Sequence, residues 1–157
     1  MQMEWLKTGI GPLEGLISFL QKSSATRNIH KRQLIRELQN NLNVFKNGFI
    51  NSASYDVMID LLSNEAVKEA IKANFPFKQL KHGIIEPRYI LDERNQRYQG
   101  WTADKLVDKI DEKIEELKTI KKLNRGSVEN VKNNINLMMS NLYYRMKLLV
   151  DFIRGEL

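Results

Sequence analysis

The chain has 157 residues, of which 42% are hydrophobic and 28% are charged, and its formal net charge is +6. This length fits one domain, residues 1–157, whose hydrophobic core needs no disulfide or metal to hold it together. Because the chain has no cysteine, its composition excludes disulfides, thiolate zinc sites, iron–sulfur clusters and cysteine nucleophiles.

The N-terminal segment lacks the features of a signal peptide. Glu4 stands where a basic region is required, and glycines interrupt the apolar residues that follow. The longest apolar-rich stretch, residues 137–153, contains three charged residues and is therefore expected to be a core helix. We expect a cytoplasmic protein with no membrane partner, in which residues 1–11 are a flexible lead-in.

Hydrophobic residues recur at helical intervals through the first half of the chain. Residues 13–20 follow the i, i+3, i+4, i+7 pattern of a first helix. The same spacing predicts a second helix over residues 28–48, with Gly48 as its C-terminal stop. Two shorter helices are predicted over 54–62 and 65–74. They begin at Ser54 and Asn64, both residues that accept hydrogen bonds at helix N-termini.

Residues 75–100, called the crossover below, contain prolines and glycines that interrupt any long helix. A long helix is then predicted from Thr102 to residue 123, and a last one from Ser127 to about Arg154. Because the last helix is apolar over a broad arc, we expect it to touch several neighbours and to pair antiparallel with the preceding helix. The predicted fold is an all-α, up-and-down bundle of about four main helices, with short extra helices between the second and third.

No motif in the sequence assembles a catalytic or metal site. His30 and His82 are the only histidines and lie far apart, and no Glu-x-x-His pair or Gly-x-Ser-x-Gly elbow occurs. The acidic residues of 104–116 alternate with lysines, which is typical of a solvated helix face. We therefore expect no catalytic residue, no metal and no cofactor, and a protein that is not an enzyme.

Residues 84–101, which include the end of the crossover and Trp101 directly after it, contain an aromatic–arginine mixture of the composition enriched at protein interfaces. Its members are Arg88, Tyr89, Arg94, Arg97, Tyr98 and Trp101. They are the candidate partner-binding residues. The competing interpretation is that the rings close one end of the bundle, each polar atom finding a hydrogen-bond partner there.

Positive charge is concentrated in one predicted helix. Residues 27–52 hold five basic residues against one acidic residue. Four of these form a short basic ridge that is a candidate nucleic-acid-binding surface: Arg27, Lys31, Arg32 and Arg36. Such a ridge would contact phosphates in a salt-sensitive, sequence-independent way.

Three functional hypotheses follow. The first is a non-enzymatic intracellular helical module that binds another protein or a second copy of itself. The alternative is a basic nucleic-acid-binding module. The third is a phosphocarrier that uses His30, although the residues around it do not match the familiar phosphotransfer pattern.

Overall fold

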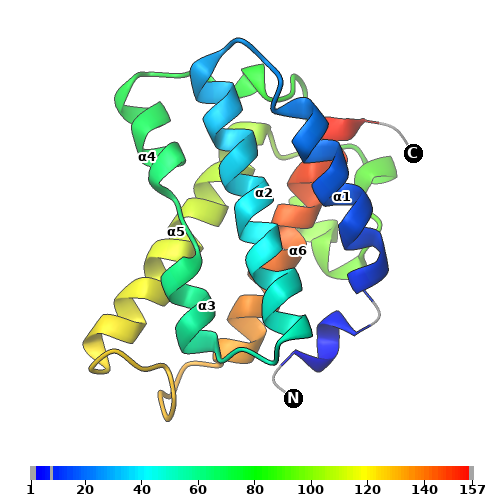
Figure 1. Cartoon of the computed structure of the whole chain (residues 1–157). Helices are drawn as coiled ribbons and strands as arrows, with labels where there is room; N and C mark the ends of the chain where they lie inside the picture. Colours follow the sequence, from blue (N-terminus) through cyan, green and yellow to red (C-terminus); the bar gives the residue numbers. More distant parts are fainter. Residues whose placement is uncertain (1–2, 8, 156–157) are drawn as a thin grey trace.

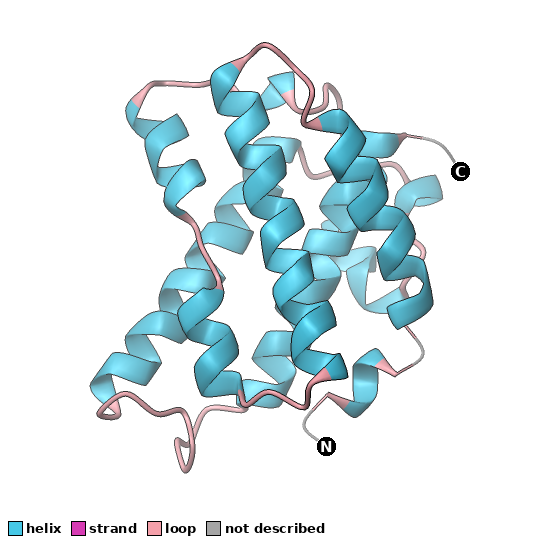
Figure 2. Ribbon diagram, in the orientation of Figure 1, coloured by secondary structure: helices cyan, strands magenta, loops and turns pink. Residues whose placement is uncertain are grey.

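The structure, a computed structural model, describes residues 3–7 and 9–155. In these residues it has six α-helices and no strand, which confirms the all-α fold (Figures 1 and 2). The helices are α1 (Ile10–Ser23), α2 (Ile29–Ile50), α3 (Tyr55–Leu61), α4 (Glu65–Lys72), α5 (Ala103–Leu123) and α6 (Ile135–Arg154). Four short 3₁₀ helices accompany them: η1 (Glu4–Leu6), η2 (Phe77–Gln79), η3 (Pro87–Tyr89) and η4 (Glu93–Tyr98). As predicted, two short helices separate the second long helix from the third.

Short polar side chains begin several helices. Ser54 Oγ accepts a hydrogen bond from the backbone N–H of Val57 (3.3 Å), and Thr102 Oγ1 accepts one from that of Lys105 (3.4 Å). Asn28 Oδ1 accepts a hydrogen bond from the backbone N–H of Lys31 (3.0 Å) and so caps α2. Helices α1 and α2 are therefore two separate helices. These contacts satisfy N–H groups that have no partner within the helix.

The sequence predicts that α2 ends at Gly48, and the structure shows that it does not. The helix continues to Ile50, and Gly48 instead lies where α3 approaches most closely. A Cβ at this position would stand 2.7 Å from Sδ of Met58. The absence of a side chain at Gly48 therefore allows α3 to pack closely on α2. The spacing of residues along α2 does not reveal this requirement.

Asn64 occupies the N-cap position of α4, but its side chain makes no capping hydrogen bond to that helix. Its Nδ2 donates to Asp111 on α5 (2.8 Å), while Glu37 on α2 accepts a hydrogen bond from Ala66 N (2.7 Å). The N-terminus of α4 is thus satisfied by a carboxylate from a different helix, and the predicted capping role of Asn64 is wrong.

The last helix begins later than predicted, at Ile135 and not at Ser127. Asp56 on α3 accounts for the difference: its carboxylate accepts hydrogen bonds from Ser127 Oγ (2.8 Å) and Val128 N (2.6 Å). These bonds hold the two residues in a loop that reaches α3. Asn134 caps the helix instead, accepting from Leu137 N (3.0 Å).

The described part of the N-terminal segment packs against the core. Met3 and Leu6 are buried, and the Trp5 ring lies 5.4 Å from that of Tyr143, centroid to centroid. The indole N–H of Trp5 also donates to Tyr55 Oη (3.3 Å). The expected flexible lead-in is therefore corrected for residues 3–7 and 9–11, because burying these apolar side chains outweighs the freedom of the chain. Residues 1–2 and 8 lie outside the described residues.

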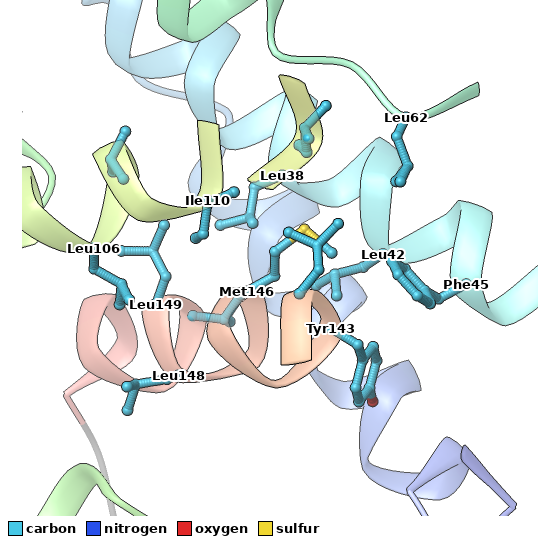
Figure 3. Close-up of a cluster of buried hydrophobic side chains, with 14 of the residues drawn as sticks. Leu38, Leu42, Phe45, Leu62, Leu106, Ile110, Tyr143, Met146, Leu148 and Leu149 are labelled. Atoms are coloured by element: carbon cyan, nitrogen blue, oxygen red, sulfur yellow. The ribbon is translucent and has the colours of Figure 1, made fainter. Parts of the chain in front are cut away.

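The core is built around α6, which contacts α1, α2, α5, η3 and η4. Figure 3 shows side chains of α2, α5 and α6 meeting at its centre, among them Leu42, Ile110, Met146 and Leu149. In Figure 1, α6 runs back against the direction of α5. The broad apolar arc of α6 thus contacts several neighbouring elements, as the sequence predicts. None of the helices in the described part of the chain has the length and apolar character that a bilayer span requires.

Candidate functional site

The aromatic members of the crossover belong to the interior. Tyr89 and Tyr98 are both buried, and Tyr89 packs edge-on against Phe152 of α6 with ring centroids 5.5 Å apart. Tyr98 Oη accepts a hydrogen bond from the buried guanidinium of Arg145, and the half-buried Trp101 packs on its ring at 4.8 Å. These contacts favour the interpretation in which the rings close the bundle.

The crossover arginines are exposed, but each one contacts other side chains of the protein. Arg94 donates to Ser140 and lies 4.3 Å over the ring of Tyr144, both on α6. Arg88 bonds to Glu86 (2.7 Å) and to the hydroxyl of Tyr89 (2.7 Å). Arg97 lies 5.0 Å over the Tyr98 ring. The six predicted partner-binding residues therefore fasten the crossover to α6 and to itself.

A buried ion pair strengthens the same attachment. Lys147 on α6 donates to Asp92 of the crossover (3.0 Å) and to Asp151 one turn along the helix (3.3 Å). Burial acts to lower the pKa of Lys147, but Asp151 and Asp92 raise it above its ordinary value, so the lysine stays charged. A charge buried in this way is tolerated because it is paired.

The predicted basic ridge lies at the start of α2. Arg27 and Arg36 are exposed, while Lys31 and Arg32 are partly exposed. None of the four forms an ion pair with a described residue, in contrast to Lys46 of the same helix, which pairs with Glu14. The predicted ridge is thus free of ion pairs within the described residues, and its role in nucleic-acid binding stays a prediction.

Other elements bring further cations to the same end of the molecule. The end of α1 contributes Lys22, and η2 contributes Lys78. Asn28 Nδ2 donates to Gln79 Oε1 (3.1 Å), which ties η2 to the start of α2 (top of Figure 1). We call the resulting cluster the basic end: Lys22, Arg27, Lys31, Arg32, Arg36 and Lys78. Lys22 and Lys78 do not belong to the ridge predicted from the sequence; a contact between distant parts of the chain places Lys78 there, and the short connection from α1 to α2 places Lys22.

His30 lies beside the basic end but faces inward. Its ring packs against Phe75 (centroids 5.9 Å apart), and its buried Nδ1 has no hydrogen-bond partner among the described residues. A buried Nδ1 cannot attack a phosphodonor, so phosphoryl transfer through this histidine would need Nε2.

Two carboxylates that the sequence did not single out face a small cavity between α2, α4, α5 and α6. Glu37 and Asp111 line it together with Asn41 and Asn64, and its volume is about 30 Å³. Burial raises the pKa of the Glu37 carboxyl, opposed by the hydrogen bonds from Ala66 and Ser63. Burial likewise raises that of Asp111, opposed by the hydrogen bond from Asn64.

The chemistry open to this cavity is limited by its size. A volume of about 30 Å³ admits a water molecule but no organic substrate. Both carboxylates already serve as hydrogen-bond acceptors between helices. Within the described residues there is also no cluster of three or more histidine and acidic side chains placed to hold a metal.

A larger groove opens between α2 and α3. Its volume is about 310 Å³, and its lining is wholly uncharged: Asn40, Asn43, Val44, Asn47, Gly48, Asn51, Ala53, Val57, Met58 and Leu61. Four asparagines follow one another along α2 at helical spacing. We call Asn40, Asn43, Asn47 and Asn51 the carboxamide stripe. The sequence pattern alone does not connect these asparagines with α3.

No protein-family model, curated protein or solved structure matches the chain.

Proposed function

We propose that the protein is a non-enzymatic helical module that binds nucleic acid through its basic end. The observation that carries the proposal is that three separate elements contribute cations to one end of the bundle, and that none of these side chains is paired with a described carboxylate. Unpaired cations are free to exchange their counterions for phosphates, which is the main source of nucleic-acid affinity.

The surface next to the arginines suits the same ligand. Along α2 the exposed face next to Arg36 has no acidic side chain, because the only acidic residue of the helix, Glu37, faces α4. Guanidinium groups donate hydrogen bonds to phosphates and bases. An anionic membrane is the weaker candidate, because the rings nearest this end, Phe75 and Phe77, are buried and cannot insert into lipid.

Fluorescence anisotropy with a labelled duplex and a labelled single strand tests the proposal. Four phosphate contacts predict that affinity for the duplex falls roughly a hundredfold between about 50 and about 200 mM salt. Absence of binding at the lower salt concentration would overturn the proposal. Tighter binding to anionic vesicles than to either nucleic acid would assign the basic end to lipid instead.

Two double variants separate a local site from net charge. Arg32→Gln with Arg36→Gln is expected to weaken binding and to reduce the slope of log affinity against log salt by about two. The matched control, Lys122→Gln with Lys132→Gln, removes the same charge from exposed positions near the opposite end of the molecule. Equal losses in the two variants would contradict a site at the basic end.

Binding to protein is the second candidate function, and the groove between α2 and α3 favours it. The crossover does not serve this function in our proposal, since its aromatic rings are occupied within the core. For both candidate functions we propose a cytoplasmic location.

A further inference from the structure

We propose that the groove between α2 and α3 is a self-association surface, on which a second copy of this chain docks with its α2 antiparallel to the first. This surface is separate from the basic end. Its floor and one rim are apolar, and Ile50, Val57 and Leu61 beside it are 59%, 52% and 62% exposed. Exposed aliphatic side chains beside a shaped groove are typical of a docking surface for a helix.

The lining of the groove carries no charge that would repel a second copy. In a chain with 28% charged residues, no lysine, arginine, aspartate or glutamate lines it. Its polar groups are carboxamides, each of which both donates and accepts hydrogen bonds. A carboxamide surface is therefore complementary to a copy of itself, whereas a charged surface would be repelled by its copy.

The spacing of the carboxamide stripe matches a two-fold axis. Asn43 and Asn47 are one turn apart, and Asn40 and Asn51 flank them on either side. In an antiparallel pair of α2 helices centred between Asn43 and Asn47, Asn43 meets Asn47 of the second copy. Asn40 then lies within one residue of the level of the second copy's Asn51, the C-cap residue, whose Nδ2 also donates to O of Asn47 in its own chain (2.9 Å). Such a contact is isologous and closes after two subunits.

The same arrangement separates the positive charges. Arg36 lies nine residues from the centre of the stripe, so the two Arg36 side chains of an antiparallel pair stand about 27 Å apart at 1.5 Å per residue. This separation exceeds the screening length of about 8 Å at physiological salt. A parallel pair would bring the two basic ends together. The antiparallel pair is thus the one that the charge distribution permits.

A charge-exchange experiment on the full chain tests the inference. The wild type is expected to double in mass by light scattering as its concentration rises from the micromolar to the millimolar range. The variants Asn43→Glu/Asn47→Glu and Asn43→Lys/Asn47→Lys are each expected to stay monomeric through repulsion. Mixing the two variants is expected to restore the dimer, because glutamates then meet lysines across the interface.

Control variants separate a change in the groove from a change in net charge or in folding. Gln21→Glu with Gln99→Glu changes two exposed carboxamides away from the groove and is expected to dimerise like the wild type. Circular dichroism verifies that each variant is folded, and restoration by mixing excludes misfolding as the cause of a monomer. A wild type that stays monomeric at millimolar concentration would overturn the inference. So would charged variants that dimerise alone, since the contact would then use another face.

Discussion

At the scale of single residues, Glu37 shows how a partly buried carboxylate can serve structure. It accepts hydrogen bonds from Ser63 Oγ (2.8 Å) and Ala66 N (2.7 Å), and so joins α2 to the first turn of α4. A negative charge near a helix N-terminus is favourable. Desolvation opposes this charge and raises the pKa of the carboxyl above its ordinary 4.5.

Replacing Glu37 by glutamine should alter the pH dependence of stability. In the folded protein the carboxyl binds its proton more tightly than in the unfolded chain, so ionising it costs more in the folded state. The unfolding free energy of the wild type, relative to Glu37→Gln, should therefore fall as pH rises from about 4.5 through the raised folded pKa, and then level off. Urea unfolding of both proteins across this range measures the difference.

The opposite slope would mean that the hydrogen bonds to Glu37 outweigh its burial. The variant Glu37→Ala measures how much the hydrogen bonds to Glu37 contribute to the free energy of unfolding. At low pH it should lose about 1–3 kcal/mol, because Ser63 and Ala66 are left without an acceptor. This loss should become smaller as pH rises, as it does relative to Glu37→Gln.

At the scale of elements, the approach of α3 to α2 depends on a glycine inside a helix. Alanine ordinarily stabilises a helix interior by about 0.5–1 kcal/mol over glycine. At Gly48, however, the added Cβ would meet Met58 at 2.7 Å, whereas at Gly15 in α1 nothing lies within 4 Å. The same substitution therefore has opposite consequences at the two sites.

Gly48→Ala should destabilise the protein by about 1 kcal/mol net, because overpacking outweighs the gain in helix propensity. Gly15→Ala should stabilise it by about 0.5–1 kcal/mol. Chemical denaturation of the two variants beside the wild type measures both changes. A stabilising Gly48→Ala would show that Met58 moves aside at no cost, and that the glycine is not needed for close packing.

At the scale of the whole molecule, one continuous cluster of buried side chains runs from Met3 to Phe152. It includes residues of every α-helix and of the crossover, so no part has a core of its own. We therefore expect one cooperative unfolding transition.

The two tryptophans provide local probes of that transition. Trp5 reports on the N-terminal segment and Trp101 on the junction between the crossover and α5, and both pack against the core. In the single-tryptophan variants Trp5→Phe and Trp101→Phe, the fluorescence midpoint should coincide with that of far-ultraviolet circular dichroism. Separate midpoints within one variant would indicate two independently folding units.

Local patterns predicted the features that depend on near neighbours in the chain. Helical spacing predicted the long helices, and short polar residues marked the starts of α3 and α5 at Ser54 and Thr102. The basic ridge at Arg32 and Arg36 was also predicted, because residues four apart share one face of a helix. Such features depend only on residues a few positions apart in the sequence.

Other features depend on partners far away in the chain, and only the tertiary structure decided them. Asp56 holds Ser127 in a loop from a distance of 71 positions, and Tyr98 becomes a core residue because Arg145 reaches its hydroxyl. Gly48, Asn64 and the groove beside the carboxamide stripe likewise acquire their roles from α3 and α5. The amino-acid sequence alone determined an all-α chain with one basic helix. Which polar groups are buried, and which surfaces remain open, was decided by contacts that no local spacing encodes.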